Sequence, residues 1–98
     1  MTHRLPGNDY QLHRLPNGLR VITSEMPNAL SVSCALFLAV GSRYEDDALA
    51  GVSHVVEHMV FKGTRDYPTP KDLALAIEGV GGYFNASTDQ EATVFYAK

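Results

Sequence analysis

The stretch that decides the fold is residues 51–64, GVSHVVEHMVFKGT. On a helical wheel turned by about 100° per residue, with His54 at zero, Glu57 falls at about 300° and His58 at about 40°. The three polar side chains therefore share one face of a helix. We expect this helix to run over residues 48–61.

The opposite side of this helix is apolar and is expected to face the core. It is formed by Leu49, Val52, Val55, Val56, Met59 and Val60. Ala50 and Gly51 fall on the polar side, where small residues leave room for a metal, a third ligand and a substrate.

The spacing His-x-x-Glu-His on one helix face points to a metal site. Histidines four residues apart, here His54 and His58, can aim ring nitrogens at one point, which suits tetrahedral Zn²⁺. Glu57 can then act as general base toward a water activated by the metal. The pattern is a metallopeptidase signature. A plain α+β interaction module with histidines on a surface helix is the alternative that the residues leave open.

Upstream, the sequence predicts three strands. Residues 10–15 and 19–25 are joined through Asn17-Gly18, a strong hairpin signal because both positions tolerate positive φ. Residues 31–40 form a longer strand, and its apolar second half predicts burial on both faces. Residues 1–9 are expected to be flexible.

Downstream, the sequence predicts a second helix and a second hairpin. Thr69 can cap this helix with Pro70 at its first position, and glycines 79, 81 and 82 end it. Residues 83–88 and 92–97 form the hairpin. The fold class is α+β, a mostly antiparallel sheet with two helices packed on one face.

Composition narrows the function classes. The chain has 98 residues, enough for one small domain, and a formal net charge of −3, which argues against nucleic-acid binding. No apolar run approaches the ~18 residues needed to cross a membrane, and neither a signal nor a transit peptide is seen. Cys34 is the only cysteine. A cytoplasmic protein is therefore expected.

Residues 51–64 resemble the active-site signature of the pitrilysin/insulinase-type zinc peptidases, the inverzincins. This family includes the mitochondrial processing peptidases and many bacterial homologues. The resemblance continues in residues 17–21 (NGLRV), 81–88 (GGYFNAST) and 91–96 (EATVFY), so it covers nearly the whole chain after Tyr10. The chain resembles the N-terminal part of the family's catalytic domain.

The resemblance implies a zinc-dependent metalloendopeptidase that acts on extended or unfolded peptides. It implies that His54 and His58 bind one zinc ion per complete site and that Glu57 is the base. It also implies that Asn85 and Ala86 lie on the strand beside the metal, where the peptide substrate binds as an added strand.

Family members are several times longer than this chain, so the resemblance also implies a fragment. The third zinc ligand is expected beyond Lys98 rather than at Glu45, Glu78 or Glu91. A complementary domain or second subunit is the expected partner, and the mitochondrial matrix is a possible home of a relative. The alternative within the family is a non-catalytic subunit that binds or presents peptides.

Overall fold

The computed structural model describes residues 2–4 and 10–98, with side chains from residue 10 onward. The chain divides into two compact units, Met1–Leu30 and Ser31–Lys98. Residues 1–9 were expected to be flexible. Residues 1 and 5–9 lie outside the described residues, and Thr2–Arg4 forms strand β1. The assignment of all 98 residues to one domain stays a prediction.

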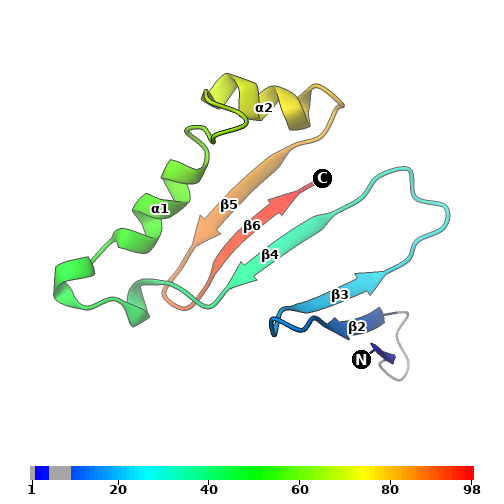
Figure 1. Cartoon of the computed structure of the whole chain (residues 1–98), viewed down its shortest axis with the longest axis horizontal. Helices are drawn as coiled ribbons and strands as arrows, with labels where there is room; N and C mark the ends of the chain where they lie inside the picture. The colour runs from blue at the N-terminus through cyan, green and yellow to red at the C-terminus, as the bar shows by residue number, and fades with distance from the viewer. Residues whose placement is uncertain (1, 5–9) are drawn as a thin grey trace. The chain divides into compact units, whose positions relative to one another are not determined.

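The first unit is a three-stranded antiparallel sheet with the order β1-β2-β3 (Figure 1). Strand β2 is Tyr10–Arg14 and β3 is Arg20–Ser24. The hairpin between them is confirmed, but only Gly18 takes a positive φ, of 88°. The Gly18 N–H donates to Leu15 O at 2.9 Å, and the Asn17 side chain accepts from the Leu19 N–H at 3.0 Å. Asn17 thus contributes a side-chain hydrogen bond rather than an unusual backbone angle.

The second unit holds an antiparallel sheet with the order β4-β6-β5. Its strands are β4 (Cys34–Leu38), β5 (Phe84–Thr88) and β6 (Thr93–Ala97). The predicted second hairpin is confirmed as β5–β6. Strand β4 is shorter than the predicted residues 31–40, and it is exposed along its length rather than buried on both faces. Among the described strands it pairs with β6 alone.

Helix α1 spans Val52–Val60, and α2 spans Pro70–Glu78. The expected start of α1 at residue 48 is wrong, because Gly51 sits in the left-handed region with φ 86° and separates α1 from a short 3₁₀ turn, η2 (Asp47–Leu49). An earlier 3₁₀ turn, η1, covers Ser42–Tyr44. Helix α2 begins as predicted, with a reciprocal capping box between Thr69 and Asp72.

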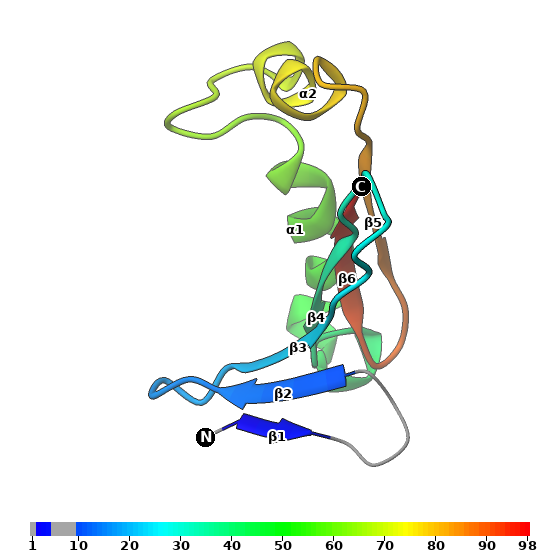
Figure 2. The same ribbon diagram turned by 90° about the vertical axis from the view of Figure 1, so that its right-hand side faces the viewer.

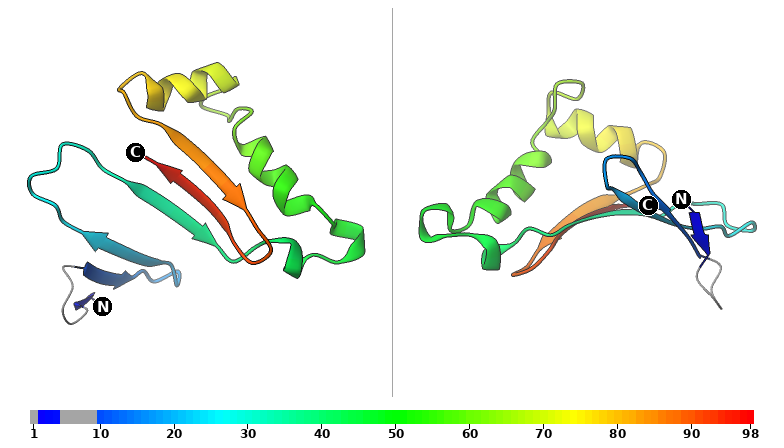
Figure 3. Two further views of the ribbon diagram at one scale, coloured as in Figure 1. Left: turned by 180° about the vertical axis from the view of Figure 1, so that it is seen from behind. Right: turned by 60° about the horizontal axis from the view of Figure 1, so that its bottom comes forward.

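Both helices lie on the same side of this sheet, which confirms the α+β class (Figures 2 and 3). Alternation along the strands places Phe84, Ala86 and Thr88 on the helix side of β5. Phe61, which follows α1, stacks on Phe84 with ring centroids 5.1 Å apart. The two layers therefore meet along β5.

The side of α1 that faces the sheet is not the one expected. Its half-buried residues are Ser53 and Glu57, and Phe61 continues the same stripe one turn later. The predicted apolar back is exposed, with Val55 58% and Met59 59% accessible. The stripe of Ser53, Glu57 and Phe61 contacts β5 instead, through the Glu57–Thr88 hydrogen bond and the Phe61–Phe84 stack.

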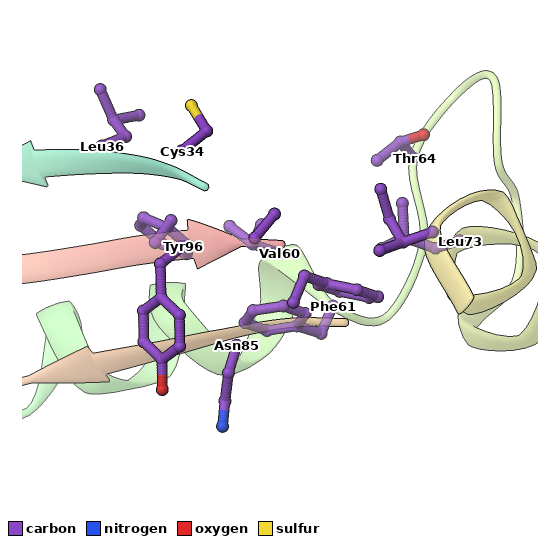
Figure 4. A pocket seen from close by; sticks show the side chains of 12 residues that line it. Cys34, Leu36, Val60, Phe61, Thr64, Leu73, Asn85 and Tyr96 are labelled. Atoms are coloured by element: carbon purple, nitrogen blue, oxygen red, sulfur yellow. The ribbon is translucent and has the colours of Figure 1, made fainter. Parts of the chain in front are cut away.

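No large apolar side chain is buried among residues 10–98, where Gly41 and Thr93 are the buried residues. An apolar hollow of ≈ 520 Å³ remains between the helices and the sheet (Figure 4). It is lined by Cys34, Leu36, Val60, Phe61, Thr64, Leu73, Ile77, Phe84, Asn85, Phe95, Tyr96 and Ala97. Within the described residues, no helix is both long and apolar enough to cross a bilayer.

Candidate metal centre

The two histidines of the motif meet one turn apart on α1. The Nε2 atoms of His54 and His58 are 2.6 Å apart, and the rings stack with centroids 4.6 Å apart and planes inclined by 19°. Both side chains are exposed, so an ion can reach them from solvent. The helix therefore brings two imidazole donors to one point, as the spacing predicts.

The pair fits a zinc ion as part of a ligand set. Tetrahedral coordination at Zn–N distances of about 2.0–2.1 Å separates two nitrogens by about 3.3 Å, so the rings must open slightly to hold the metal. Both Nε2 atoms must then present lone pairs instead of sharing a proton. In residues 2–4 and 10–98, no three His, Cys, Asp or Glu side chains gather into a group that can hold a metal.

Glu57 connects the helix to the sheet. Its Oε2 accepts a hydrogen bond at 2.5 Å from the hydroxyl of Thr88, the last residue of β5. Thr88 lies opposite Thr93 in the β5–β6 register. Glu57 is half-buried, unlike the two histidines.

Glu45 anchors the start of α1. Its carboxylate accepts from the Gly51 N–H at 2.8 Å and from the Ser53 N–H at 2.7 Å. Hydrogen bonds from the Ser53 side chain and then from the Ser53 and Gly51 amides hold the pKa of Glu45 below its ordinary value. The negative charge of Glu45 near the N-terminus of α1 also interacts favourably with the positive end of the helix dipole. Glu45 thus serves the helix that carries the histidines.

A polar hollow of ≈ 460 Å³ adjoins the histidine pair. It is lined by Ser42, Glu45, Gly51, Ser53, His54, Thr88, Asp89 and Gln90. His54 is the residue of the pair that lines this hollow.

Gly41 and the 3₁₀ turn η1 fix the rim of this hollow against residues 89–91. The Arg43 N–H donates to Gln90 O at 2.8 Å, and the Arg43 side chain forms an ion pair with Glu91. Gly41 is required because a Cβ there would lie 2.4 Å from Asp89 O. Amides of residues 91 and 92 donate to the Asp89 carboxylate, which lowers the pKa of Asp89.

Asn85 and Ala86 lie in the middle of β5, which pairs only with β6 among the described strands. The Tyr83 and Asp89 amides donate to the carbonyls of Lys98 and Ala92, which flank β6, so the alternation of antiparallel pairing turns the Ala86 N–H to the outer edge. That N–H donates to the Asn85 side-chain oxygen at 2.8 Å. The Asn85 side chain points to the face away from the helices (Figure 4).

Two residues around the motif, Thr88 and Thr93, were not singled out from the sequence, and Glu45 was considered only as a metal ligand. The signal for Thr88 and Thr93 was available, because strand alternation places both hydroxyls on the face that carries Phe84 and Phe95. The contact of Glu45 with the start of α1 gave no local signal, since Glu45 precedes Gly51 by six residues and the 3₁₀ turn η2 lies between them.

Comparison with known proteins agrees with this geometry. Residues 20–98 match the family described as insulinase, peptidase family M16. A zinc protease of Rickettsia felis is 44% identical over 90 residues, which cover 92% of this chain and 22% of that protein. The mitochondrial-processing peptidase subunit beta of Saccharomyces cerevisiae is 38% identical over 98 residues, 100% of this chain and 21% of that protein. The chain spans about a fifth of the length of these relatives.

Solved structures show the same fold. The crystal structure of pitrilysin superposes with a TM-score of 0.80 at 32% identity, covering 98% of this chain and 11% of that one. A protease from Helicobacter pylori gives a TM-score of 0.81 at 28% identity, covering 92% of this chain and 22% of that one. With its motif on a helix beside an antiparallel sheet, the chain belongs to the insulinase family of peptidases, family M16.

Proposed function

We propose that this chain supplies the N-terminal part of a zinc metalloendopeptidase that cleaves extended or unfolded peptides. The observation that carries the proposal is the approach of the His54 and His58 Nε2 atoms to 2.6 Å, with Glu57 on the same helix. Membership in a family with relatives named zinc proteases supports zinc as the metal.

His54 and His58 hold the ion through Nε2. When bound, zinc lowers the pKa of water to about 7 and polarises the carbonyl of the scissile peptide. From the resemblance to the family, we place the third ligand, a glutamate, beyond Lys98. Among the described residues, no three His, Cys, Asp or Glu side chains gather into a group that can hold a metal. A complementary domain or second subunit then closes the site against water.

Glu57 moves the proton. As general base it takes a proton from the attacking water, and it then delivers that proton to the amine that leaves when the peptide bond breaks. Its carboxylate is held on the sheet side of α1 by Thr88.

The substrate lies along the open edge of β5. The Ala86 N–H turns outward there and exchanges its bond to the Asn85 side chain for one to a substrate carbonyl. Main-chain hydrogen bonds grip a peptide whatever its side chains, but they require an extended strand, so unfolded segments are favoured.

A reducing compartment, the cytoplasm or the mitochondrial matrix, suits the free and exposed Cys34.

Substitution of Glu57 by Gln in the complete peptidase tests this proposal. We expect turnover of an unfolded peptide to fall about 10²- to 10⁴-fold while zinc content stays unchanged, because a neutral amide cannot take the proton. His54→Ala and His58→Ala should each lower zinc content. Retained turnover in the Glu57→Gln protein refutes the role of Glu57. Zinc near zero in the unsubstituted protein favours the alternative, a non-catalytic subunit that binds or presents peptides.

A further inference from the structure

We propose that Thr88 is a positioning residue for the general base: its hydroxyl holds the Glu57 carboxylate in the one orientation from which it can take the proton. The inference rests on the proposed function, because it assigns a role that acts through Glu57.

The contact itself is short and sheltered. The Thr88 Oγ1–H donates to Glu57 Oε2 at 2.5 Å, and both residues are half-buried. Hydrogen bonds between a hydroxyl and an ionised carboxylate have lengths of about 2.5–2.7 Å and are about twice as strong as neutral ones. The bond uses Oε2, so Oε1 is left for the water.

Thr88 is itself fixed by the sheet. It faces Thr93 directly across the β5–β6 pair, and Thr93 is 2% exposed. The Thr93 hydroxyl lies 3.1 Å from Val40 O and 3.3 Å from Thr88 Oγ1. Thr93 has one hydroxyl proton and donates to one of these two oxygens, while the Thr88 proton remains on the bond to Glu57. The paired strands β5 and β6 therefore carry the hydroxyls that lie next to this carboxylate.

Such support matters for a general base. A glutamate side chain has several rotatable bonds and loses considerable rotamer freedom when it is ordered. The base must lie within about 2.6–3.2 Å of the proton that it takes, and a misplacement of about 1 Å can cost 10²-fold in rate. A strand residue that fixes the carboxylate supplies this order before the substrate arrives.

Kinetics of the complete, zinc-loaded peptidase on an unfolded peptide give the first test. We expect Thr88→Val, which keeps the shape and loses the hydroxyl, to lower kcat about 10- to 100-fold with little change in KM or zinc content. Thr88→Ser, which keeps the hydroxyl, should retain most of the kcat of the unsubstituted enzyme. The matched control is Thr23→Val, the same change at an exposed strand position in the other unit, and it should leave kcat unchanged.

If Thr88→Val does not fold, Thr88→Ser and Thr88→Ala decide the matter, because both lack the methyl group and they differ only in the hydroxyl. A serine variant at least about tenfold faster than the alanine variant supports the inference. Equal rates overturn it, as does an unchanged kcat in a folded Thr88→Val protein.

The second readout does not depend on activity. In the metal-free protein, side-chain NMR couplings of Glu57 should report one rotamer, and Thr88→Val should produce averaged couplings. Unaltered couplings contradict the inference. The Glu57→Gln variant separates the two claims: if it turns over normally, the proposed function fails, whereas a dead Glu57→Gln beside a normal Thr88→Val removes only the role of Thr88.

Discussion

The position of the Glu57 carboxylate is set by the sheet as well as by helix α1. Its backbone belongs to α1, but its carboxylate is bonded to Thr88 on β5. The neighbouring histidines have no such tie to the sheet and remain exposed, with their Nε2 atoms facing each other. The division suits the proposed roles, since metal ligands must be reachable by an ion and a general base must be held still.

Glu45 leads to a prediction about pH at the residue scale. Its folded pKa is depressed below the ordinary value of 4.5, so its stabilising effect on α1 is fully present above that value and is lost as pH falls through the folded pKa. We expect amide exchange in residues 51–60, corrected for the intrinsic effect of pH, to accelerate in acid.

Glu45→Gln should raise this exchange at neutral pH and reduce its dependence on pH below 4.5. Glu25→Gln, at an exposed position in the other unit, is the control and should behave as the unsubstituted chain. An acid response of α1 that is identical in the Glu45→Gln variant contradicts the anchoring role.

At the scale of elements, local signals in the sequence predicted local features well. The Thr69-Pro70 start of α2 and both hairpins required only neighbouring residues, and the i, i+4 spacing brought His54 and His58 together. The orientation of α1 on the sheet was not predictable in this way. The amphipathic rule predicts that the apolar side of α1 faces the core, whereas here α1 meets β5 through the Glu57–Thr88 hydrogen bond and the Phe61–Phe84 stack.

The consequence is an exposed apolar stripe on α1. Val52, Val55, Val56 and Met59 are 40–59% accessible on the side away from the sheet. Contiguous exposed apolar patches promote association. We therefore expect the isolated 98-residue chain to self-associate in sedimentation velocity, and Val55→Lys with Met59→Lys to reduce that association.

The two lysines move the formal net charge from −3 to −1, which by itself weakens repulsion between copies, so reduced association cannot come from net charge. The control adds the same charges at Leu30 and Val32, which are 105% and 79% exposed but lie off the helix. If the unsubstituted chain is monomeric, the expected association is absent. If the control variant reduces association equally well, the apolar stripe on α1 is not its cause.

At the scale of the whole molecule, neither unit has much of an interior among the described residues. Residues 10–98 bury Gly41 and Thr93 but no large apolar side chain, and the ≈ 520 Å³ hollow beside α2 is unfilled. The composition, with 45% hydrophobic residues, is ordinary for a globular protein. It could not show where the apolar surface goes, because burial of Val55 or Phe37 depends on what packs against them, not on their own identity.

The central claim is that one zinc ion is held by the two imidazoles of α1 next to Glu57. Zinc-edge X-ray absorption of the complete peptidase measures this most directly, compared with its His58→Ala variant. We predict two imidazole nitrogens at about 2.0–2.1 Å in the unsubstituted protein and the loss of zinc or of an imidazole in the variant. A zinc environment without imidazole, or one that His58→Ala leaves unchanged, would contradict the account.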